Sequence, residues 1–309
     1  GAISPGAVGF DINCGVRVLA LEATVDDIPN IKKLGGRMAG RIPAGASGKG
    51  GLDIDMPQIR ALTEGGAQAA VEMGIGFDED LPSLESNGLL EVEDATLSNR
   101  AYERGLRALG TLGSGNHFLE LQSVEKLVDE ETAKHWGLYE GQLLAMIHSG
   151  SRGLGHQVCS EHSRKLEQKY KRTTDGWYAE EYDFTLTDRQ LACAPIHSKE
   201  GQSYLQEMNA AANFAFANRS ALAHRLREVL RLEMGVDGEA RTLYDVAHNI
   251  AKIETHIVHG KNCQCAIHRK GATRAFAGDS GHVQNNFQGT GQPVLVPGDM
   301  GTGSWLSLI

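Results

Sequence analysis

The chain has 309 residues, of which 41% are hydrophobic, enough to bury a substantial core as one large domain or two smaller ones. Its formal charge of −9 argues against nucleic-acid binding through a generally basic surface, but leaves room for a local basic groove. Five cysteines at irregular spacing form no disulfide framework, and no apolar run reaches the ~18 residues of a membrane span. We therefore expect a globular cytoplasmic protein without a membrane partner.

The first informative stretch is DINCGVRVLAL, in which Asp11 and Cys14 bracket a tight turn before a strand from Val16 to Leu21. A carboxylate and a thiol at this spacing can reach one metal ion, and a thiolate can bridge two. The pair also fits a structural role, with Asp11 capping the turn and Cys14 buried as a small hydrophobe. This stretch alone leaves both interpretations open.

Residues 22–109 indicate helices and connectors without evident chemistry. A short helix is expected within residues 22–36, where its glycines end it, and a glycine-rich loop with Arg41 and Lys49 could touch a polyanion. The apolar spacing predicts two further helices, over Met56–Met73 and Leu97–Leu109.

The stretch LGTLGSGNHFLELQ combines a glycine-broken turn with a strand that begins near Phe118. Asn116 can offer both a donor and an acceptor to a purine edge or a phosphate. His117 stands at the start of the strand, where a metal ligand and a hydrogen-bonded structural histidine are equally compatible with the pattern.

The stretch LAMIHSGSRGLGHQV predicts a strand over Leu143–Ile147 that ends at His148, followed by a glycine-rich turn and a helix from about Leu154. Glycine lets backbone N–H groups approach an anion, and the forked cation of Arg152 suits a phosphate. The turn is not a P-loop, because the G-x-x-x-x-G-K-[ST] pattern is absent. An ordinary strand-to-helix turn with a core histidine is the alternative.

Further along, residues 161–172 and 204–234 have helical patterns, and the aromatic residues of 173–189 are expected to fill a local core. The longer helix is interpreted as scaffold that ends near Gly235. Its later arginines are expected on a solvated face; they are Arg225, Arg227 and Arg231.

A strand over Leu243–Val246 leads directly into His248 and Asn249, a third histidine at a strand end. Cys263 and Cys265 lack the second cysteine pair of a zinc site. The stretch PVLVPGDMGTGSW is a plausible loop for a nucleotide edge. RNA or phosphate contact is expected at a compact cationic spot made by Arg269, Lys270 and Arg274.

Three histidines at strand ends beside glycine- or asparagine-containing turns, together with an early Asp and Cys, predict a metal site. Five ligands exceed a closed four-coordinate zinc site, and a bridging thiolate would distribute them over two ions. The predicted ligands are Asp11, Cys14, His117, His148 and His248.

Five stretches in this order, DINCGVR, LGTLGSGNHF, HSGSRGLGHQ, YDVAHNIAK and RKGATRAF, resemble the RtcB family of RNA-splicing ligases. The resemblance covers essentially the whole chain. It implies a Mn²⁺- and GTP-dependent ligase that joins an RNA 3′-phosphate or 2′,3′-cyclic phosphate end to a 5′-hydroxyl end, in tRNA splicing or RNA repair, with an archease-type activator as a partner. Ligand chemistry alone would favour zinc or iron, so manganese rests on the resemblance. For the fold we expect α+β, one large domain over residues 1–309 with mixed β-sheets, metal ligands at strand ends and helices outside.

The resemblance also implies residue roles. Cys14 would bridge two Mn²⁺ ions, with Asp11 and His117 on one ion and His148 and His248 on the other. Arg152 would contact RNA phosphate. The implied guanylate-binding residues are Asn116, His117, Phe118, Leu119, Glu120, His248, Asn249, Pro297, Gly298, Asp299, Met300 and Ser304.

Both ends of the chain are interpreted as cut. The family's guanylate-accepting histidine lies downstream in a His-Gly-Ala-Gly-Arg stretch, which is not reached by Ile309. A late lysine of the guanine pocket and an early Asp-x-His motif are also absent. We therefore expect this chain to bind metal without forming a covalent guanylate. Two rival functions stay open: a two-metal phosphoesterase that uses bound hydroxide, and an RNA-end binding module with a structural metal.

Overall fold

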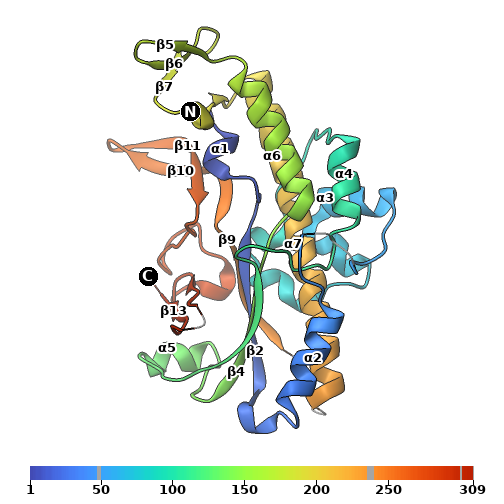
Figure 1. Cartoon of the computed structure of the whole chain (residues 1–309). Coiled ribbons are helices and arrows are strands. Elements are labelled where there is room, and N and C mark those ends of the chain that lie inside the picture. The colour runs from blue at the N-terminus through green and yellow to red at the C-terminus, as the bar shows by residue number, and fades with distance from the viewer. Residues whose placement is uncertain (47–49, 235–239, 300, 309) are drawn as a thin grey trace.

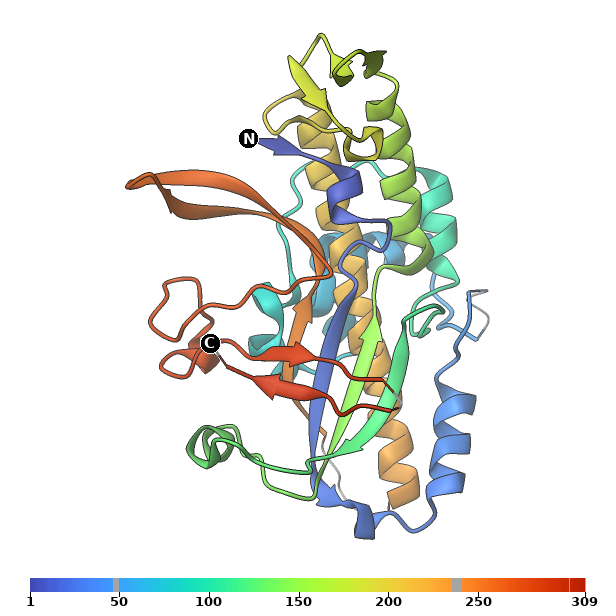
Figure 2. The same ribbon diagram turned by 60° about the vertical axis from the view of Figure 1, so that its left-hand side comes forward.

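The fold is organised around a four-stranded antiparallel sheet in the order β3-β4-β2-β9 (Figures 1 and 2). The computed structural model describes residues 1–46, 50–234, 240–299 and 301–308. An isolated parallel bridge joins Leu84 to Asp245 of β9. The predicted strands are confirmed, with bounds Gly15–Thr24 for β2, Phe118–Ser123 for β3, Gln142–Ser149 for β4 and Arg241–Ala247 for β9.

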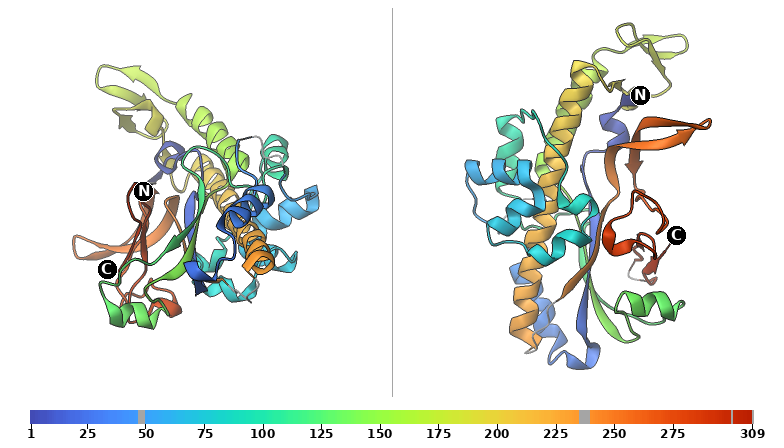
Figure 3. Two further views of the ribbon diagram at one scale, coloured as in Figure 1. Left: turned by 60° about the horizontal axis from the view of Figure 1, so that its bottom comes forward. Right: turned by 180° about the vertical axis from the view of Figure 1, so that it is seen from behind.

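Helices cover one face of this sheet, and α7 runs along the whole of it (Figure 3, right). With 36 residues, α7 is about 54 Å long at ~1.5 Å per residue. The predicted α+β organisation is confirmed, with α7 as the inner scaffold helix and the other helices around it. Their bounds are Ile31–Arg41 for α2, Met56–Glu72 for α3, Asn99–Leu106 for α4, Arg152–Glu167 for α6 and Lys199–Met234 for α7.

The alternation of β2 explains why both faces of the sheet are covered. Successive strand residues point to opposite faces. Leu19 and Leu21 pack with Leu222 and Leu226 of α7, whereas Val16 and Val18 belong to a second cluster that faces away from α7. That second cluster contains Trp136, Leu138, Val283, Phe287 and Leu295.

The remaining elements are short, except for a hairpin of two ten-residue strands, β10 and β11, that projects from the body (Figure 2). Among the described residues, no helix combines the length and apolarity needed to cross a bilayer. The short elements are β1 Ala2–Ile3, α1 Pro5–Val8, α5 Glu130–His135, β5 Lys171–Thr173, β6 Gly176–Ala179, β7 Phe184–Leu186, β8 Ala194–Pro195, β12 Val294–Val296 and β13 Trp305–Ser307; the hairpin strands are β10 Asn249–Val258 and β11 Lys261–Lys270. The described residues also form five 3-10 helices: η1 Val25–Asp27, η2 Asp78–Ser83, η3 Glu85–Gly88, η4 Arg189–Leu191 and η5 Asn285–Phe287.

Some predicted helix boundaries are wrong. Gly35 and Gly36 lie inside α2 instead of ending it, because Leu34 is buried in the cluster beneath α7 and offsets the cost of about 1 kcal/mol for each glycine. The helix predicted through residue 172 ends at Glu167, since Lys171–Thr173 pairs with β6. The predicted aromatic core of residues 173–189 is confirmed. Lys49 and Gly235 lie outside the described residues.

The arginines of α7 are mostly buried, contrary to the prediction of a solvated face. Arg225 donates to the carbonyl oxygens of Gly50 and Gly110, and Arg227 forms a bidentate pair with Asp80. Arg231 alone among the three predicted residues is exposed. Hydrophobic periodicity places an arginine on the polar face of a helix, because the sequence pattern contains no information about a buried hydrogen-bond acceptor on another element.

A fully buried ion network joins α7 to the sheet. Asp245 of β9 lies 2.7 Å from Arg17 Nε and 2.8 Å from Arg219 Nη2, and all three side chains are 0% exposed. Arg219 Nη1 also donates to the main-chain oxygens of Asn13 and Ser149, at 2.7 and 3.1 Å. One side chain therefore connects α7 with β9 and with the turns that adjoin β2 and β4.

Replacing Asp245 by Asn should destabilise the chain by about 3–5 kcal/mol, because buried Arg219 would lose its carboxylate partner and buried Arg17 would be left with Asp80 at 3.7 Å. Urea unfolding followed by far-UV circular dichroism measures the change. Glu181→Gln is the matched control, since Glu181 pairs with Lys169 but is 58% exposed, and solvent screens such pairs. Equal unfolding midpoints for the two variants would contradict a dominant role of the buried network.

Candidate metal centre and adjoining cavity

The antiparallel register brings four functional turns to one edge of the central sheet. Gly15, the first residue of β2, is paired with Ser149 near the end of β4 and with Ala247 at the end of β9. Phe118, the first residue of β3, is paired with His148. The turns that precede β2 and β3 therefore meet the turns that follow β4 and β9.

All five predicted ligand side chains lie together at this edge. Cys14 Sγ is 3.3 Å from His117 Nε2 and 3.2 Å from His148 Nε2. Asp11 Oδ2 is 2.7 Å from His117 Nε2, and His248 Nε2 is 3.1 Å from His148 Nε2. Cys14, His117 and His148 could hold a metal ion, because their ligand atoms all lie within 4.8 Å of one another.

The tautomer of His117 is set by the backbone. Its Nδ1 lies 2.9 Å from the carbonyl oxygen of Leu112, which can only accept a hydrogen bond, so Nδ1 carries the proton. Nε2 is then the nitrogen that faces Cys14 and Asp11, and it would offer its lone pair to a cation bound beside them. An imidazole whose other nitrogen donates to a carbonyl is the usual arrangement of a metal-binding histidine.

Burial and mutual crowding shift the pKa values of four groups of this cluster. Burial, with the charges of His248 and His117, lowers the pKa of His148 to about 3. Burial also lowers the pKa of His248 and, together with the Asp11 carboxylate, raises the pKa of the Cys14 thiol. Burial opposes ionisation of Asp11, but hydrogen bonding and charge from His117 outweigh it, so its pKa is lowered. A divalent cation would relieve this crowding of thiol, carboxylate and imidazole donors.

Two residues of α7 that sequence reasoning missed hold the turns in place. Asn218 accepts the N–H of Gly110 and donates to Ser149 Oγ and the Gly150 carbonyl, while its neighbour Arg219 holds Asn13 and Ser149. The polar run Asn-Arg-Ser inside an alanine- and leucine-rich helix is the signal that could have revealed them. Close packing adds a constraint, since a Cβ on Gly150 would lie 2.6 Å from Asp11 Oδ1.

A cavity of about 800 Å³ opens beside the cluster and is lined by Asp11, His117 and Arg152. Arg152 has a left-handed backbone conformation, with φ 54°, and its Nη2 donates to the Gly45 carbonyl at 3.1 Å. Helix α4, where the sequence suggested no chemistry, forms another wall with Arg100, Glu103 and Arg104 and with its C-cap residue Arg107. The three arginines follow one another at intervals of four and three residues. Side chains at this spacing lie on one face of a helix, so the sequence itself indicates that the arginines share one surface.

The residues implied to bind guanylate are partly connected by hydrogen bonds. Gln122 donates to Glu120 at 2.9 Å and to Ser304 Oγ at 3.0 Å, and Ser304 Oγ accepts the N–H of Gly298. The chain of contacts joins β3 to the loop between β12 and β13. Gln122, which the sequence did not indicate, is the connecting residue.

The other implied guanylate residues have varied surroundings. Asn116 is exposed on the lining of the large cavity, and the Phe118 ring lies 5.4 Å from that of His148. Leu119 packs against the apolar cluster beneath α7, so its side chain faces away from this site. Asn249 donates to the Asp11 carbonyl. Pro297 and Asp299 are exposed, and Met300 lies outside the described residues.

The predicted cationic spot of the β11 end is largely neutralised. Arg269 pairs with Glu254 at 2.6 Å, and Arg274 lies 3.5 Å from Glu85. Lys270 donates to the carbonyl oxygen of Gly6. Two of the three cations therefore already have carboxylate partners, and RNA or phosphate contact at this spot stays a prediction.

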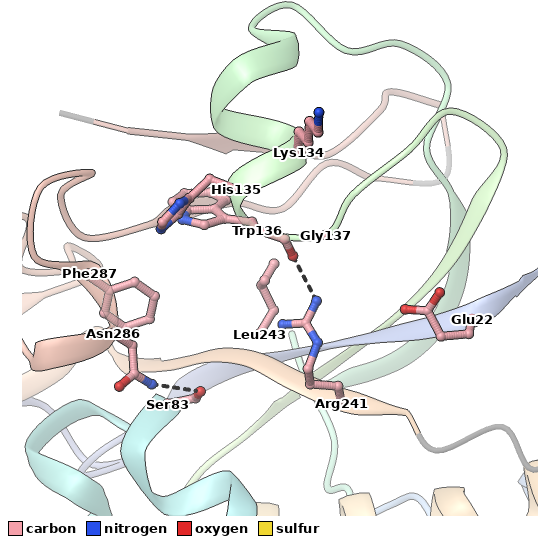
Figure 4. Close-up of a pocket in the computed structure, with 10 residues that line it drawn as sticks. All are labelled: Glu22, Ser83, Lys134, His135, Trp136, Gly137, Arg241, Leu243, Asn286 and Phe287. Atoms are coloured by element: carbon pink, nitrogen blue, oxygen red, sulfur yellow. Dashed lines mark hydrogen bonds between the residues drawn. The ribbon is translucent and has the colours of Figure 1, made fainter.

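A second cavity, of about 390 Å³, lies at the end of β9 that is remote from the metal centre (Figure 4). Arg241, the first residue of β9, lines it and donates to the Trp136 carbonyl at 2.7 Å. His248 follows the other end of the strand, roughly 23 Å away at ~3.3 Å per residue. This cavity is separate from the metal centre.

Comparison with known proteins decides the family. The sequence profile described as tRNA-splicing ligase RtcB matches residues 1–308. The chain belongs to the RtcB family. The RtcB protein of Archaeoglobus fulgidus is 46% identical over 99% of this chain, and those of Methanococcus maripaludis and Thermococcus kodakarensis are each 45% identical over 99%. All three are named tRNA-splicing ligase RtcB, and this chain spans 63% of the length of each.

A substitution in the turn before His117 tests whether cation affinity depends on the position of the His117 side chain or on strain in the backbone. A Cβ on Gly113, at φ 114°, would lie 2.3 Å from His117 Nδ1 and 2.5 Å from Arg152 Nη1. Gly113→Ala should therefore displace His117 and weaken divalent-cation binding by roughly 10- to 100-fold, as for lost second-layer contacts. Isothermal titration with Mn²⁺ measures this affinity.

Gly115→Ala is the matched control for that experiment. Gly115 also has a positive φ, of 77°, but a Cβ there meets nothing within 4 Å. It should carry the backbone strain and leave cation affinity near that of the unsubstituted chain. If both variants lost affinity equally, the contact with His117 would not be the cause.

Proposed function

We propose that the protein carrying this chain is a GTP- and Mn²⁺-dependent RNA ligase that joins 3′-phosphate or 2′,3′-cyclic phosphate ends to 5′-hydroxyl ends. The observation that carries the proposal is the meeting of the five predicted ligands at the mouth of an arginine-lined cavity. The substrates would be RNA ends such as tRNA halves or broken RNA. Membership of the RtcB family supports this substrate class, and in this proposal the protein is cytoplasmic and an archease-type protein is its activator.

The donor set fits a site for two divalent cations. Cys14 lies between His117 and His148, so a thiolate there would be shared, with Asp11 on one side and His248 on the other. When bound, such ions would polarise phosphate oxygens and stabilise the charge that develops on them. The sulfur and imidazole donors would also suit zinc, so the choice of Mn²⁺ rests on the family.

The residues of the chain would bind and position the phosphates. Arg152 offers a forked guanidinium in the same cavity as Asp11 and His117, where it can contact an RNA phosphate. The histidines of the cluster direct their Nε2 atoms at one another and at the thiol, which suits them to be ligands and not nucleophiles. The contacts Glu120–Gln122–Ser304 bring the two implied parts of a guanylate site together.

Ligation assays on the full gene product test the function. With Mn²⁺ and GTP, a labelled RNA ending in a 3′-phosphate should be joined to a 5′-hydroxyl RNA, and omission of GTP should abolish joining. A two-metal phosphoesterase would instead release phosphate without GTP, and an RNA-end binding module would retain the RNA unchanged. Either result would reject the ligase proposal.

The bridging role of Cys14 has its own test. Cys14→Ala should lower the affinity for both ions together, because a shared ligand is lost from each site. Elemental analysis and Mn²⁺ titration give the stoichiometry. Cys159→Ala is the control, since Cys159 is equally buried but contacts Pro5 and Ser163 instead of the cluster. Two ions bound with unchanged affinity in the Cys14 variant would disprove the bridge.

A further inference from the structure

An exposed aromatic pair stands on the wall of the arginine-lined cavity, and neither of its members belongs to the predicted metal or guanylate set. Phe10, which directly precedes Asp11, is 51% exposed. Its ring centroid lies 5.0 Å from that of His156, with 30° between the planes. Both residues line the cavity together with His117 and Arg152. A half-exposed aromatic ring on a cavity wall offers an apolar face that another flat group can cover.

The two rings come from elements whose positions are fixed. Phe10 is attached to the turn that carries Asp11 and Cys14, where Asn13 Nδ2 donates to the Ala212 carbonyl of α7. His156 lies in the second turn of α6, and its Nδ1 is 3.4 Å from Ser160 Oγ. Burial and the nearby Arg104 lower the pKa of His156, which favours the neutral ring. A neutral imidazole tilted by 30° against the phenyl ring leaves this aromatic pair uncharged.

The chemistry around the pair indicates what would cover it. Four arginines, at positions 100, 104, 107 and 152, line the cavity against two carboxylates, Asp11 and Glu103. The lining therefore favours a ligand with negative charge, and the exposed ring offers that ligand a flat apolar face as well. A nucleotide combines the two. Single-stranded nucleic acids bind in this way, with phosphates along a cationic groove and bases stacked on aromatic side chains.

We propose that Phe10, supported by His156, is a stacking platform for a nucleobase of the RNA strand whose terminal phosphate lies at the metal centre. The proposal rests on the function proposed above, and it adds a base-binding subsite to a phosphate-binding one. Stacking accepts any base, because every base has a flat face. The subsite would therefore position the RNA end without selecting its sequence.

The first measurement compares four RNA probes by fluorescence anisotropy with Mn²⁺ present. One is a single-stranded hexanucleotide with a 3′-phosphate, and the others carry an abasic site at one of its last three nucleotides. Phe10→Ala should weaken binding of the intact probe by roughly tenfold. It should leave unchanged the binding of the abasic probe that lacks the stacked base. Phe10→Trp should restore binding of the intact probe.

Phe77→Ala is the matched control, because Phe77 is 36% exposed and its ring also lies beside a histidine, His224, at 5.5 Å. That pair does not line the cavity, so the variant should bind every probe like the unsubstituted chain. Thermal melting verifies that both variants are folded. The salt dependence adds a check: Phe10→Ala should not change the slope of log affinity against log salt, since no phosphate contact is lost.

A second readout follows the base directly. A 2-aminopurine at the stacked position should lose fluorescence on binding to the unsubstituted chain and keep it on binding to Phe10→Ala. If Phe10→Ala bound all probes as the unsubstituted chain does, or lost the same factor on every abasic probe, the stacking platform would be disproved while RNA-end binding stood. If the unsubstituted chain bound no probe, both the platform and the proposed function would be overturned.

Discussion

The burial of one carboxylate between two guanidinium groups constrains the rest of the structure. Asp245 has no exposed surface, and neither have Arg17 and Arg219. Removing three charges from water costs several kcal/mol per ion, and the network is tolerable only because its geometry satisfies the charges and most of their hydrogen-bonding groups. The sheet and α7 must therefore meet in one register, since a shift of one residue would move Arg17 to the opposite face of β2.

That constraint reaches the metal centre through a single side chain. The remaining donors of Arg219 bind the carbonyl and side-chain oxygens of Asn13 and the carbonyl oxygen of Ser149. Asn13 directly precedes Cys14, and Ser149 directly follows His148. Asn218 fixes the neighbouring turns in the same way. The ligands thus sit on turns whose backbone is held from beneath by a long helix. A site held in this way needs little rearrangement when a cation binds.

Sequence patterns predicted the parts of this site that depend on local chemistry. Each of the three histidines, His117, His148 and His248, stands between a turn and an apolar or alternating strand, which is a pattern that the sequence shows directly. Antiparallel pairing of these strands then brings the three side chains together. The buried roles of Arg225 and Arg227, the polar run at Asn218 and the cavity wall of α4 were missed. Each depends on a partner far away in the sequence, and a polar residue on a helix looks the same whether it meets water or a buried carbonyl.

The distribution of charge explains how an acidic chain can present a site for a polyanion. The chain carries a formal charge of −9, and the cations near the end of β11 are held by Glu254 and Glu85. Within the part of the chain that the structure describes, Arg100, Arg104 and Arg107 form no ion pair, and they line the same cavity as Arg152, with Glu103 and Asp11 as its acidic members. The net negative charge of the chain repels phosphate, while the four arginines of the cavity lining attract it, so the field favours binding in the cavity over non-specific binding. A nucleic acid would be bound mainly where it enters this cavity, as the joining of strand ends proposed above requires.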